Sequence, residues 1–487
     1  AFDITAGTGT QLVFTVQPAT TTAGAPINSA VEVTARDAMG NTATGFTGNV
    51  TVAIGTNPNG GALSGTTTVA AVAGVATFST LSIDKSGTGY TLTAGATEFS
   101  GATSTGFAIT PGPATQLAFT VQPSNTTAGA TITPAVQVTA RDAQGNTATG
   151  FTGNVTVAIG ANPGGSTRSP AVQAAVAGVA TFSALSIEKV GTGYTITAVA
   201  TGLAGTTSTT FDITPGAATQ LVFTVQPATT TAGVTINSAV EVTVHDALGN
   251  TATGFTGNVT VAIGTNPNGG TLAGTTTLAA AAGIATFSTL SIDKVGTGYT
   301  LTGAATGLGG ATSTSFEITP GAAALLVFTV QPTSTTAGAS ITPAVQVTAR
   351  DAQGNTATGF TGNVTVAIGT NPGGGTLSGT TTVAASAGVA SFANLSINKS
   401  GTGYTLTAAA TGFAGLTSTT FDITPGAPTQ LFFTVLPSSA TAGASMTPAV
   451  QVTARDGLGN TATGFAGNVT VAIGANPGGG TLSGTTT

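Results

Sequence analysis

The sequence predicts an all-β protein, a tandem array of antiparallel β-sandwich domains that form an extended rod. Three observations lead to this prediction. Apolar and polar residues alternate over short runs, which is the period-two pattern of half-buried strands. Clusters of Gly, Asn, Pro and Thr separate these runs and are typical of turns. The whole pattern recurs about every 105 residues, which is the size of a small domain.

The composition excludes several classes of protein. Charged residues make up only 5% of the 487 residues, against roughly 25% in an ordinary soluble protein. The hydrophobic content of 40% is too high for a disordered chain. A net charge of −6 without a basic patch offers no site for nucleic acid, and no apolar run approaches the roughly 20 residues needed for membrane insertion. With one His and no Cys, we predict that the protein is not an enzyme and needs no cofactor.

The repeat is regular enough to place domain boundaries. The marker Phe-x-Ile-Thr recurs in steps of 105, 104, 105 and 105 residues, and the short step comes from a one-residue deletion near Arg168 that marks a surface loop. Ile-Thr-Pro-Gly joins successive units, and its proline stiffens the joint. The predicted segments are 1–7, the last strand of a preceding repeat; 8–111, 112–215, 216–320 and 321–425, four Ig-like repeats; and 426–487, an incomplete repeat.

The second repeat shows which segments are expected as strands. About seven short strands per repeat, with no sustained helical pattern, indicate a sandwich of immunoglobulin type. Thr fills the outward positions, which suits a pleated surface. The apolar positions of the expected strands are Leu117, Phe119 and Val121; Val136, Val138 and Ala140; Val155, Val157 and Ile159; Leu185 and Ile187; Tyr194 and Ile196; Phe211 and Ile213.

The tyrosines occupy one position of the repeat, in the motif Lys-x-Gly-Thr-Gly-Tyr-Thr. We expect each to open the penultimate strand of its unit and to form a tyrosine corner, whose hydroxyl bonds to nearby backbone. The alternative is an aromatic residue at the rim with an exposed hydroxyl. The four positions are Tyr90, Tyr194, Tyr299 and Tyr404.

One longer motif carries a resemblance to a known family. Val-Thr-Ala-Arg-Asp-Ala-x-Gly-Asn-Thr-Ala-Thr-Gly-Phe, followed by Asn-Val-Thr-Val, resembles the bacterial Ig-like domains of invasin- and intimin-type surface proteins. The resemblance covers every repeat, although that family often has Pro-Val after Gly-Asn where this chain has Thr-Ala. Family members use such domains as stalks that hold an adhesive tip away from the cell. The resemblance therefore implies a stalk and does not carry adhesion over.

The Asp-x-x-Gly-Asn motif is the one candidate metal site. Calcium binds six to eight oxygens, yet each repeat offers only this Asp and one further acid, such as Glu188. We therefore favour a turn in which the Asp caps the backbone, Gly145 takes a positive φ and Arg141 screens the charge. The predicted metal content is none, and the weak calcium candidates are Asp37, Asp142, Asp246, Asp351 and Asp456.

Asn-Val-Thr in every repeat is a glycosylation acceptor pattern, and the alternative is that Gly-Asn only ends a turn. Because the Val points inward, the Asn and Thr are expected to face solvent. The candidate acceptors are Asn49, Asn154, Asn258, Asn363 and Asn468.

The predicted function is structural. We expect an extracellular or cell-surface stalk or fibre that self-associates into a fibre or lateral array, because uncharged surfaces pack without stripping water from ions. Surface glycans are a candidate partner, and we expect no binding of nucleic acid and no membrane insertion by this segment. Two alternatives stay open: an adhesin segment that binds a sugar or host protein, and an ice-binding repeat. The fifth repeat lacks the 42 residues that follow Thr382 in the fourth, so we also expect further repeats on both sides.

Overall fold

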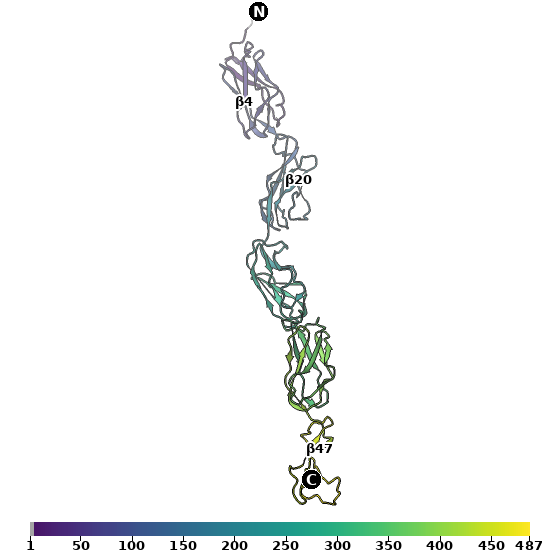
Figure 1. Ribbon diagram of the computed structural model, residues 1–487. Coiled ribbons are helices and arrows are strands. Elements are labelled where there is room, and N and C mark those ends of the chain that lie inside the picture. The colour runs from purple at the N-terminus through teal and green to yellow at the C-terminus, as the bar shows by residue number, and fades with distance from the viewer. Residues whose placement is uncertain (1–3) are drawn as a thin grey trace. The chain divides into compact units, whose positions relative to one another are not determined.

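The computed structural model describes residues 4–487. All regular secondary structure among these residues is β-strand (Figure 1). The all-β class is therefore confirmed, with small sheets repeated in tandem. By internal contacts the chain divides into two units: one runs to Thr219 and includes Val244–Phe255, and the other comprises Gln220–Thr243 and Thr256–Thr487. Residues 1–3, which hold part of the predicted strand at 1–7, lie outside the described residues.

The strands fall into five successive sets, one for each repeat. The first repeat contains β1 (Gln11–Val16), β2 (Thr21–Thr22), β3 (Val31–Arg36), β4 (Asn49–Ile54), β5 (Leu63–Ser64), β6 (Thr68–Ala70), β7 (Val75–Phe78), β8 (Ser82–Ile83), β9 (Gly87–Tyr90), β10 (Leu92–Gly95), β11 (Ala102–Thr103) and β12 (Phe107–Thr110). The second contains β13 (Gln116–Val121), β14 (Thr126–Thr127), β15 (Val136–Arg141), β16 (Asn154–Ile159), β17 (Ala171–Ala174), β18 (Val179–Phe182), β19 (Gly191–Tyr194), β20 (Ile196–Val199), β21 (Thr206–Thr207) and β22 (Phe211–Thr214).

The later repeats follow the same order. The third contains β23 (Ala218–Val225), β24 (Thr230–Thr231), β25 (Val240–Asp246), β26 (Asn258–Ile263), β27 (Leu272–Ala273), β28 (Thr277–Ala279), β29 (Ile284–Phe287), β30 (Ser291–Ile292), β31 (Gly296–Tyr299), β32 (Leu301–Ala304), β33 (Ala311–Thr312) and β34 (Phe316–Thr319). The fourth contains β35 (Leu325–Val330), β36 (Thr335–Thr336), β37 (Val345–Arg350), β38 (Asn363–Ile368), β39 (Leu377–Ser378), β40 (Thr382–Ala384), β41 (Val389–Phe392), β42 (Ser396–Ile397), β43 (Gly401–Tyr404), β44 (Leu406–Ala409), β45 (Leu416–Thr417) and β46 (Phe421–Thr424). The fifth contains β47 (Gln430–Val435) and β48 (Gln451–Arg455).

The first repeat shows how the strands form a sandwich. One sheet has the order β1-β3-β7, and two others have the orders β2-β12-β9 and β11-β10-β4-β6. Only Thr91 separates β9 from β10, so one chain segment links the second sheet to the third. Strand β2 runs parallel to β12, whereas the other strand pairs of this repeat are antiparallel.

Period-two alternation builds the core as the sequence predicts. On β16, Val155 and Val157 are buried and Asn154 is exposed. On β3, Val31 and Val33 have no exposed surface. Burying one such side chain contributes about 1.5–3 kcal/mol, so this alternation fixes which face of each strand turns inward.

Two sequence predictions are wrong in detail. The first repeat has twelve strands rather than about seven, because its long turns add two- and three-residue strands such as β5 and β8. Each Tyr closes its strand instead of opening the penultimate one; Tyr90 ends β9, and β10, β11 and β12 follow.

The fifth repeat exposes apolar side chains that are buried in the fourth. Leu431 and Phe433 on β47 are 53% and 50% exposed, while the equivalent Leu326 and Phe328 are 7% and 6% exposed. Among residues 4–487, no helix is long and apolar enough to cross a membrane.

Candidate functional site at the repeat junctions

Each repeat carries the turn Asp-x-x-Gly-Asn, and its Asp side chain holds the turn closed. In the second repeat, Asp142 is 1% exposed, and its Oδ1 accepts the backbone N–H groups of Gln144 at 3.0 Å and Asn146 at 2.8 Å. Its Oδ2 accepts the backbone N–H of Gly112, 2.8 Å away in the linker. Gly145 has the predicted positive φ, 79°, which glycine adopts at no steric cost. Asp142 therefore fastens the turn to the linker that enters its repeat.

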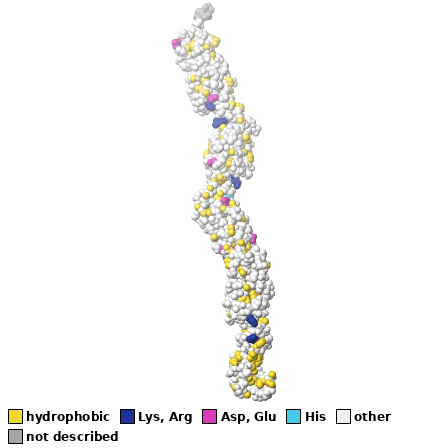
Figure 2. Space-filling model, viewed as in Figure 1, with side chains coloured by type: hydrophobic (Ala, Val, Ile, Leu, Met, Phe, Trp, Pro, Cys, Tyr) yellow, Lys and Arg dark blue, Asp and Glu magenta, His cyan; other side chains and the backbone are white. Residues whose placement is uncertain are grey.

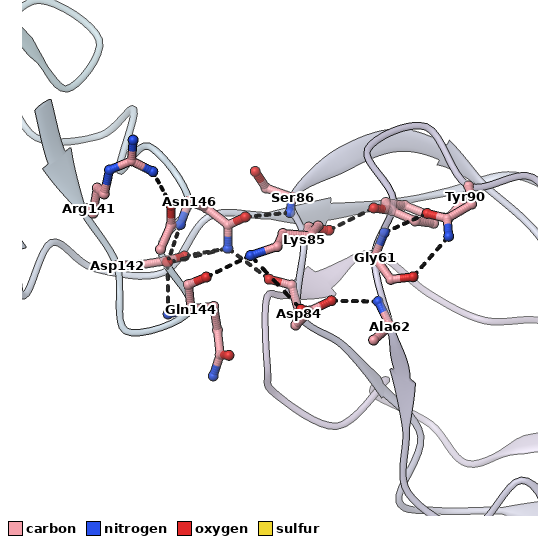
Figure 3. A network of polar contacts seen from close by, with 12 residues as sticks. Gly61, Ala62, Asp84, Lys85, Ser86, Tyr90, Arg141, Asp142, Gln144 and Asn146 are labelled. Atoms are coloured by element: carbon pink, nitrogen blue, oxygen red, sulfur yellow. Dashed lines mark hydrogen bonds and ion pairs between the residues drawn. The ribbon is translucent and has the colours of Figure 1, made fainter. Parts of the chain in front are cut away.

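Asn146, the last residue of this turn, reaches the preceding repeat (Figure 3). Its Nδ2 donates to the backbone oxygen of Asp84 at 2.9 Å, and its Oδ1 accepts the backbone N–H of Ser86 at 3.0 Å. The same Nδ2 donates to Asp142 Oδ2 at 3.0 Å, which fixes the orientation of the amide. We call residues 84–86 the receiving turn, and the pair of bonds from the Asn amide to it the junction clamp.

The tyrosine braces the receiving turn from inside its own repeat. Tyr90 has no exposed surface, and its Oη donates to the backbone oxygen of Lys85 at 3.0 Å. Its ring packs 6.1 Å from that of Phe107. Lys85 in turn donates through Nζ to the backbone oxygen of Gln144 at 3.0 Å, across the junction. A continuous set of contacts therefore runs from Tyr90 of the first repeat to the Asp142 turn of the second (Figure 3), and Asp142 extends it to Gly112 of the linker.

The same clamp recurs at the three other junctions. Asn250 donates to the oxygen of Glu188 at 2.9 Å and accepts from the N–H of Val190 at 3.3 Å. The remaining two clamps join Asn355 to Asp293 (2.9 Å) and Val295 (3.3 Å), and Asn460 to Asn398 (3.1 Å) and Ser400 (3.0 Å). The receiving turns are thus 84–86, 188–190, 293–295 and 398–400. In each, the hydroxyl of the following Tyr bonds to the central Lys, as the tyrosine-corner hypothesis requires.

The basic residues gather on these two kinds of turn. Figure 2 shows only a few small groups of charged atoms on a surface that is otherwise uncharged. Eight of the nine basic residues belong to the turns: Lys85, Lys189, Lys294 and Lys399 in the receiving turns, and Arg36, Arg141, Arg350 and Arg455 before each Asp, where the third repeat has His245. The exception, Arg168, lies 3.3 Å from Glu188 within the second repeat.

The role predicted for Arg141 is wrong. Its Nη1 donates to the backbone oxygen of Gly145, and the ion pairs of residues 4–487 are Lys85–Asp84 and Arg168–Glu188 only. Backbone N–H groups and the Asn146 amide, not a guanidinium, satisfy the Asp142 carboxylate.

Hydrogen bonds also set the acidity of these carboxylates. Burial raises the pKa of Asp456, but the Asn460 amide and the backbone N–H groups of Gly426, Asn460 and Leu458 outweigh it and lower the pKa to about 2. The pKa values of the four equivalent Asp residues are lowered too.

A loss of stability at acid pH follows from these lowered pKa values. A carboxylate whose folded-state pKa is lowered stabilises the fold above its unfolded value, near 3.9, and loses this contribution as pH falls through the folded value. We expect a constant thermal unfolding midpoint from neutral pH to about 4, and a fall between about pH 4 and 2. A midpoint that is flat down to pH 2 would contradict this account.

The described residues do not provide a set of ligands for calcium at the Asp turns. No group of three or more His, Asp or Glu residues that could hold a metal lies within the part of the chain described. Asp142 is already bonded to N–H donors at both oxygens. We expect EDTA to leave the unfolding midpoint unchanged, and a fall of many degrees would restore the five Asp residues as metal ligands.

The tyrosine hypothesis gives a second measurable result. Tyr194→Phe keeps the buried ring and removes the 2.8 Å bond to the oxygen of Lys189. We expect the second repeat to be destabilised by about 1 kcal/mol. Hydrogen exchange of this repeat in the full chain measures the change, with the other repeats as references. Unaltered exchange would indicate that the hydroxyl contributes nothing.

The candidate glycan acceptors lie at the surface. Asn49, Asn154, Asn258 and Asn363 each begin a strand and are exposed, and Asn468 is also exposed. The Val that follows each of the first four is buried.

Sequence reasoning missed the junction itself. It counted Glu188 of the same repeat as the one further acid available beside Asp142, whereas the turn of Asp142 meets Asp84 of the preceding repeat through Asn146. One signal was available. Asn ends the turn in every repeat, although Asp and Gly suffice to form the turn.

Comparisons with known proteins give matches among solved structures only. No protein-family model matches the sequence, and no curated protein matches it either. Among solved structures, the chain is similar to FdeC, an Escherichia coli adhesin, with 16% identity, a TM-score of 0.33, and coverage of 65% of this chain and 100% of that one. It is similar to InvD of Yersinia pseudotuberculosis, with 17% identity, a TM-score of 0.29, and coverage of 63% and 97%. It is also similar to invasin, a bacterial integrin-binding protein, with 15% identity, a TM-score of 0.29, and coverage of 87% and 80%.

Proposed function

We propose that this chain is a structural spacer, part of an extracellular stalk or fibre on a microbial surface. The observation that carries the proposal is the junction clamp, which recurs at all four junctions between successive repeats. Relative motion is the usual expectation for domains joined by a short linker and a small interface. A hydrogen-bonded clamp at each junction restricts that motion, and a stalk needs this restriction to keep its ends apart.

The flanks of the sandwiches support self-association as a second part of the proposal. In the first repeat, the outer face of the sheet β11-β10-β4-β6 presents Thr51, Ala53 and Thr68, with Thr51 and Thr68 Oγ1 atoms 2.9 Å apart. Contact between two such faces removes water from hydroxyl and methyl groups but from no ion, so its desolvation cost is small. The partner would be a second copy of this chain.

The role is not enzymatic in this proposal, since the buried carboxylates are engaged in turns. Glycans on the exposed Asn49, Asn154, Asn258, Asn363 and Asn468 would project from the flanks. They would limit how closely two chains approach.

Microscopy of the native material tests the proposal. Immunogold labelling of intact producing cells should place the repeats outside the envelope, and negative staining should show fibres or laterally packed rods. Label confined to the cell interior would contradict the location. Isolated particles at every protein concentration would contradict self-association and leave a stalk of single chains.

A further inference from the structure

The junctions are of alternating kinds. At each junction, the residue two positions after the Asp of the turn faces a glycine of the preceding repeat. This residue is Gln at the first and third junctions (Gln144 and Gln353) and Leu at the second and fourth (Leu248 and Leu458). The contacted glycines are Gly24, Gly129, Gly233 and Gly338, all with positive φ.

A second difference follows the same alternation. The first and third repeats contain Pro-Asn-Gly-Gly, at residues 58–61 and 267–270, and the second, fourth and fifth have Gly in place of this Asn. Asn59 and Asn268 are exposed, and they are the only Asn residues followed by Gly in the sequence.

Asn59 bonds to the receiving turn of its own repeat. Its Nδ2 donates to the backbone oxygen of Ser86 at 2.6 Å, and the N–H of the same residue donates to Asn146 Oδ1 across the junction at 3.0 Å. Asn268 makes the equivalent bond to the oxygen of Val295, also at 2.6 Å, and Val295 N–H donates to Asn355. Asn59 and Asn268 therefore each bond to the residue whose N–H donates to the clamp Asn, at the first and third junctions.

We infer that Asn59 and Asn268 are sites of spontaneous deamidation, and that this modification loosens the first and third junctions. The backbone nitrogen of Gly60 loses its proton and attacks Cγ of Asn59. A bond forms between these two atoms, and the amide nitrogen leaves as ammonia. Water then opens the five-membered succinimide at either carbonyl, giving aspartate or isoaspartate, so no oxidant or reductant is needed.

The surroundings of Gly60 permit the attack. Gly60 has φ of 64° and no side chain, and apart from its chain neighbours no atom lies within 4 Å of the position that a Cβ would take, so this side of the residue is open. Asn57 in the same loop is a built-in contrast. It precedes Pro58, whose nitrogen carries no proton. Its Nδ2 donates to the backbone oxygen of Gly61, and its Oδ1 accepts the backbone N–H of Gly61.

Deamidation of Asn59 removes the donor of its hydrogen bond to Ser86. A carboxylate has no N–H donor, so an acceptor would replace the donor 2.6 Å from the oxygen of Ser86. Two acceptors repel each other at this distance, and the Ser86 peptide must move. The Ser86 N–H that donates to Asn146 belongs to the adjoining peptide group, so a rotation about the Ser86 Cα displaces it as well and weakens the bond of the clamp.

The full chain supplies its own controls for the test. After incubation at mildly alkaline pH, complete digestion and mass spectrometry should show conversion at Asn59 and Asn268 several-fold above that at Asn41, Asn49 and Asn57. Limited trypsin digestion of the aged native protein should cleave faster after Lys85 and Lys294, with no change after Lys189 and Lys399, whose junctions have Gly at this position.

Two variants separate modification from its consequence. Asn59→Gly reproduces the Pro-Gly-Gly-Gly loop of the fourth repeat, at 372–375, and should abolish the ageing effect at Lys85 only. Asn59→Asp should raise cleavage after Lys85 without ageing. Conversion of Asn59 no faster than that of Asn41 or Asn49 would overturn the assigned site. Conversion without faster cleavage after Lys85 would overturn its effect on the junction.

Discussion

Asp246→Ala should unfold the third repeat locally while its neighbours remain folded. The carboxylate is 2% exposed and accepts the N–H groups of Gly216 at 3.0 Å, Leu248 at 2.9 Å and Asn250 at 2.9 Å. Removing it leaves one buried and two part-buried donors without this partner. Hydrogen bonds to charged groups contribute about 1.5–3 kcal/mol each, so we expect a loss of at least about 3 kcal/mol.

Hydrogen exchange of the full chain measures this loss of stability separately for each repeat. Peptides from residues 216–320 should exchange faster, and those from the second and fourth repeats should change only near the junctions. Glu317→Ala removes the same charge from an exposed position of the same repeat and should have no effect. Equal exchange in the two variants would show that the Asp246 carboxylate does not hold the turn.

Asn250→Ala should open the second junction without unfolding either repeat. It removes the junction bonds to the oxygen of Glu188 and to the N–H of Val190, and within the third repeat the bond from Nδ2 to the Asp246 carboxylate. At about 0.5–1.5 kcal/mol each, the two junction bonds together contribute about 1–3 kcal/mol, which raises the open population roughly 5- to 150-fold. Cleavage by trypsin follows the open population when opening is fast, so cleavage after Lys189 should rise by the same factor.

The specificity of this change can be checked within one chain. Cleavage after Lys85 and Lys294, at the neighbouring junctions, should be unchanged. Asn237→Ala, at an exposed position of the same repeat, should not accelerate cleavage after Lys189. Acceleration at every Lys would indicate general unfolding and would contradict a local clamp.

The sequence predicted the fold from local patterns because those patterns reflect burial. Val155 and Val157 alternate with exposed or half-buried residues, and one repeat period fixed the same strands in every unit. The two-residue strands such as β5 and β8 were not predictable, because so few residues contain no alternation.

The turn chemistry was predictable, but its partner was not. Asp and Gly in Asp-x-x-Gly-Asn indicate a closed turn, and Gly145 has the expected conformation. The function of Asn146 depends on residues about 60 positions earlier, in another repeat, and no local pattern reports such a contact. Likewise, the position of Tyr90 indicated a backbone bond but not that the bonded Lys85 belongs to the receiving turn.

The central claim is that the clamp restricts each repeat against the one before it, and a distance measurement across one junction tests it most directly. Because the chain has no Cys, spin labels can be placed at two exposed positions, Thr77 of the first repeat and Thr181 of the second, by Cys substitution. Electron–electron double resonance should give a narrow distribution of label distances in this background. Adding Asn146→Ala should broaden the distribution while both repeats stay folded, although the second repeat also loses the bond from Asn146 to Asp142. A distribution that is equally broad with and without Asn146 would contradict the claim.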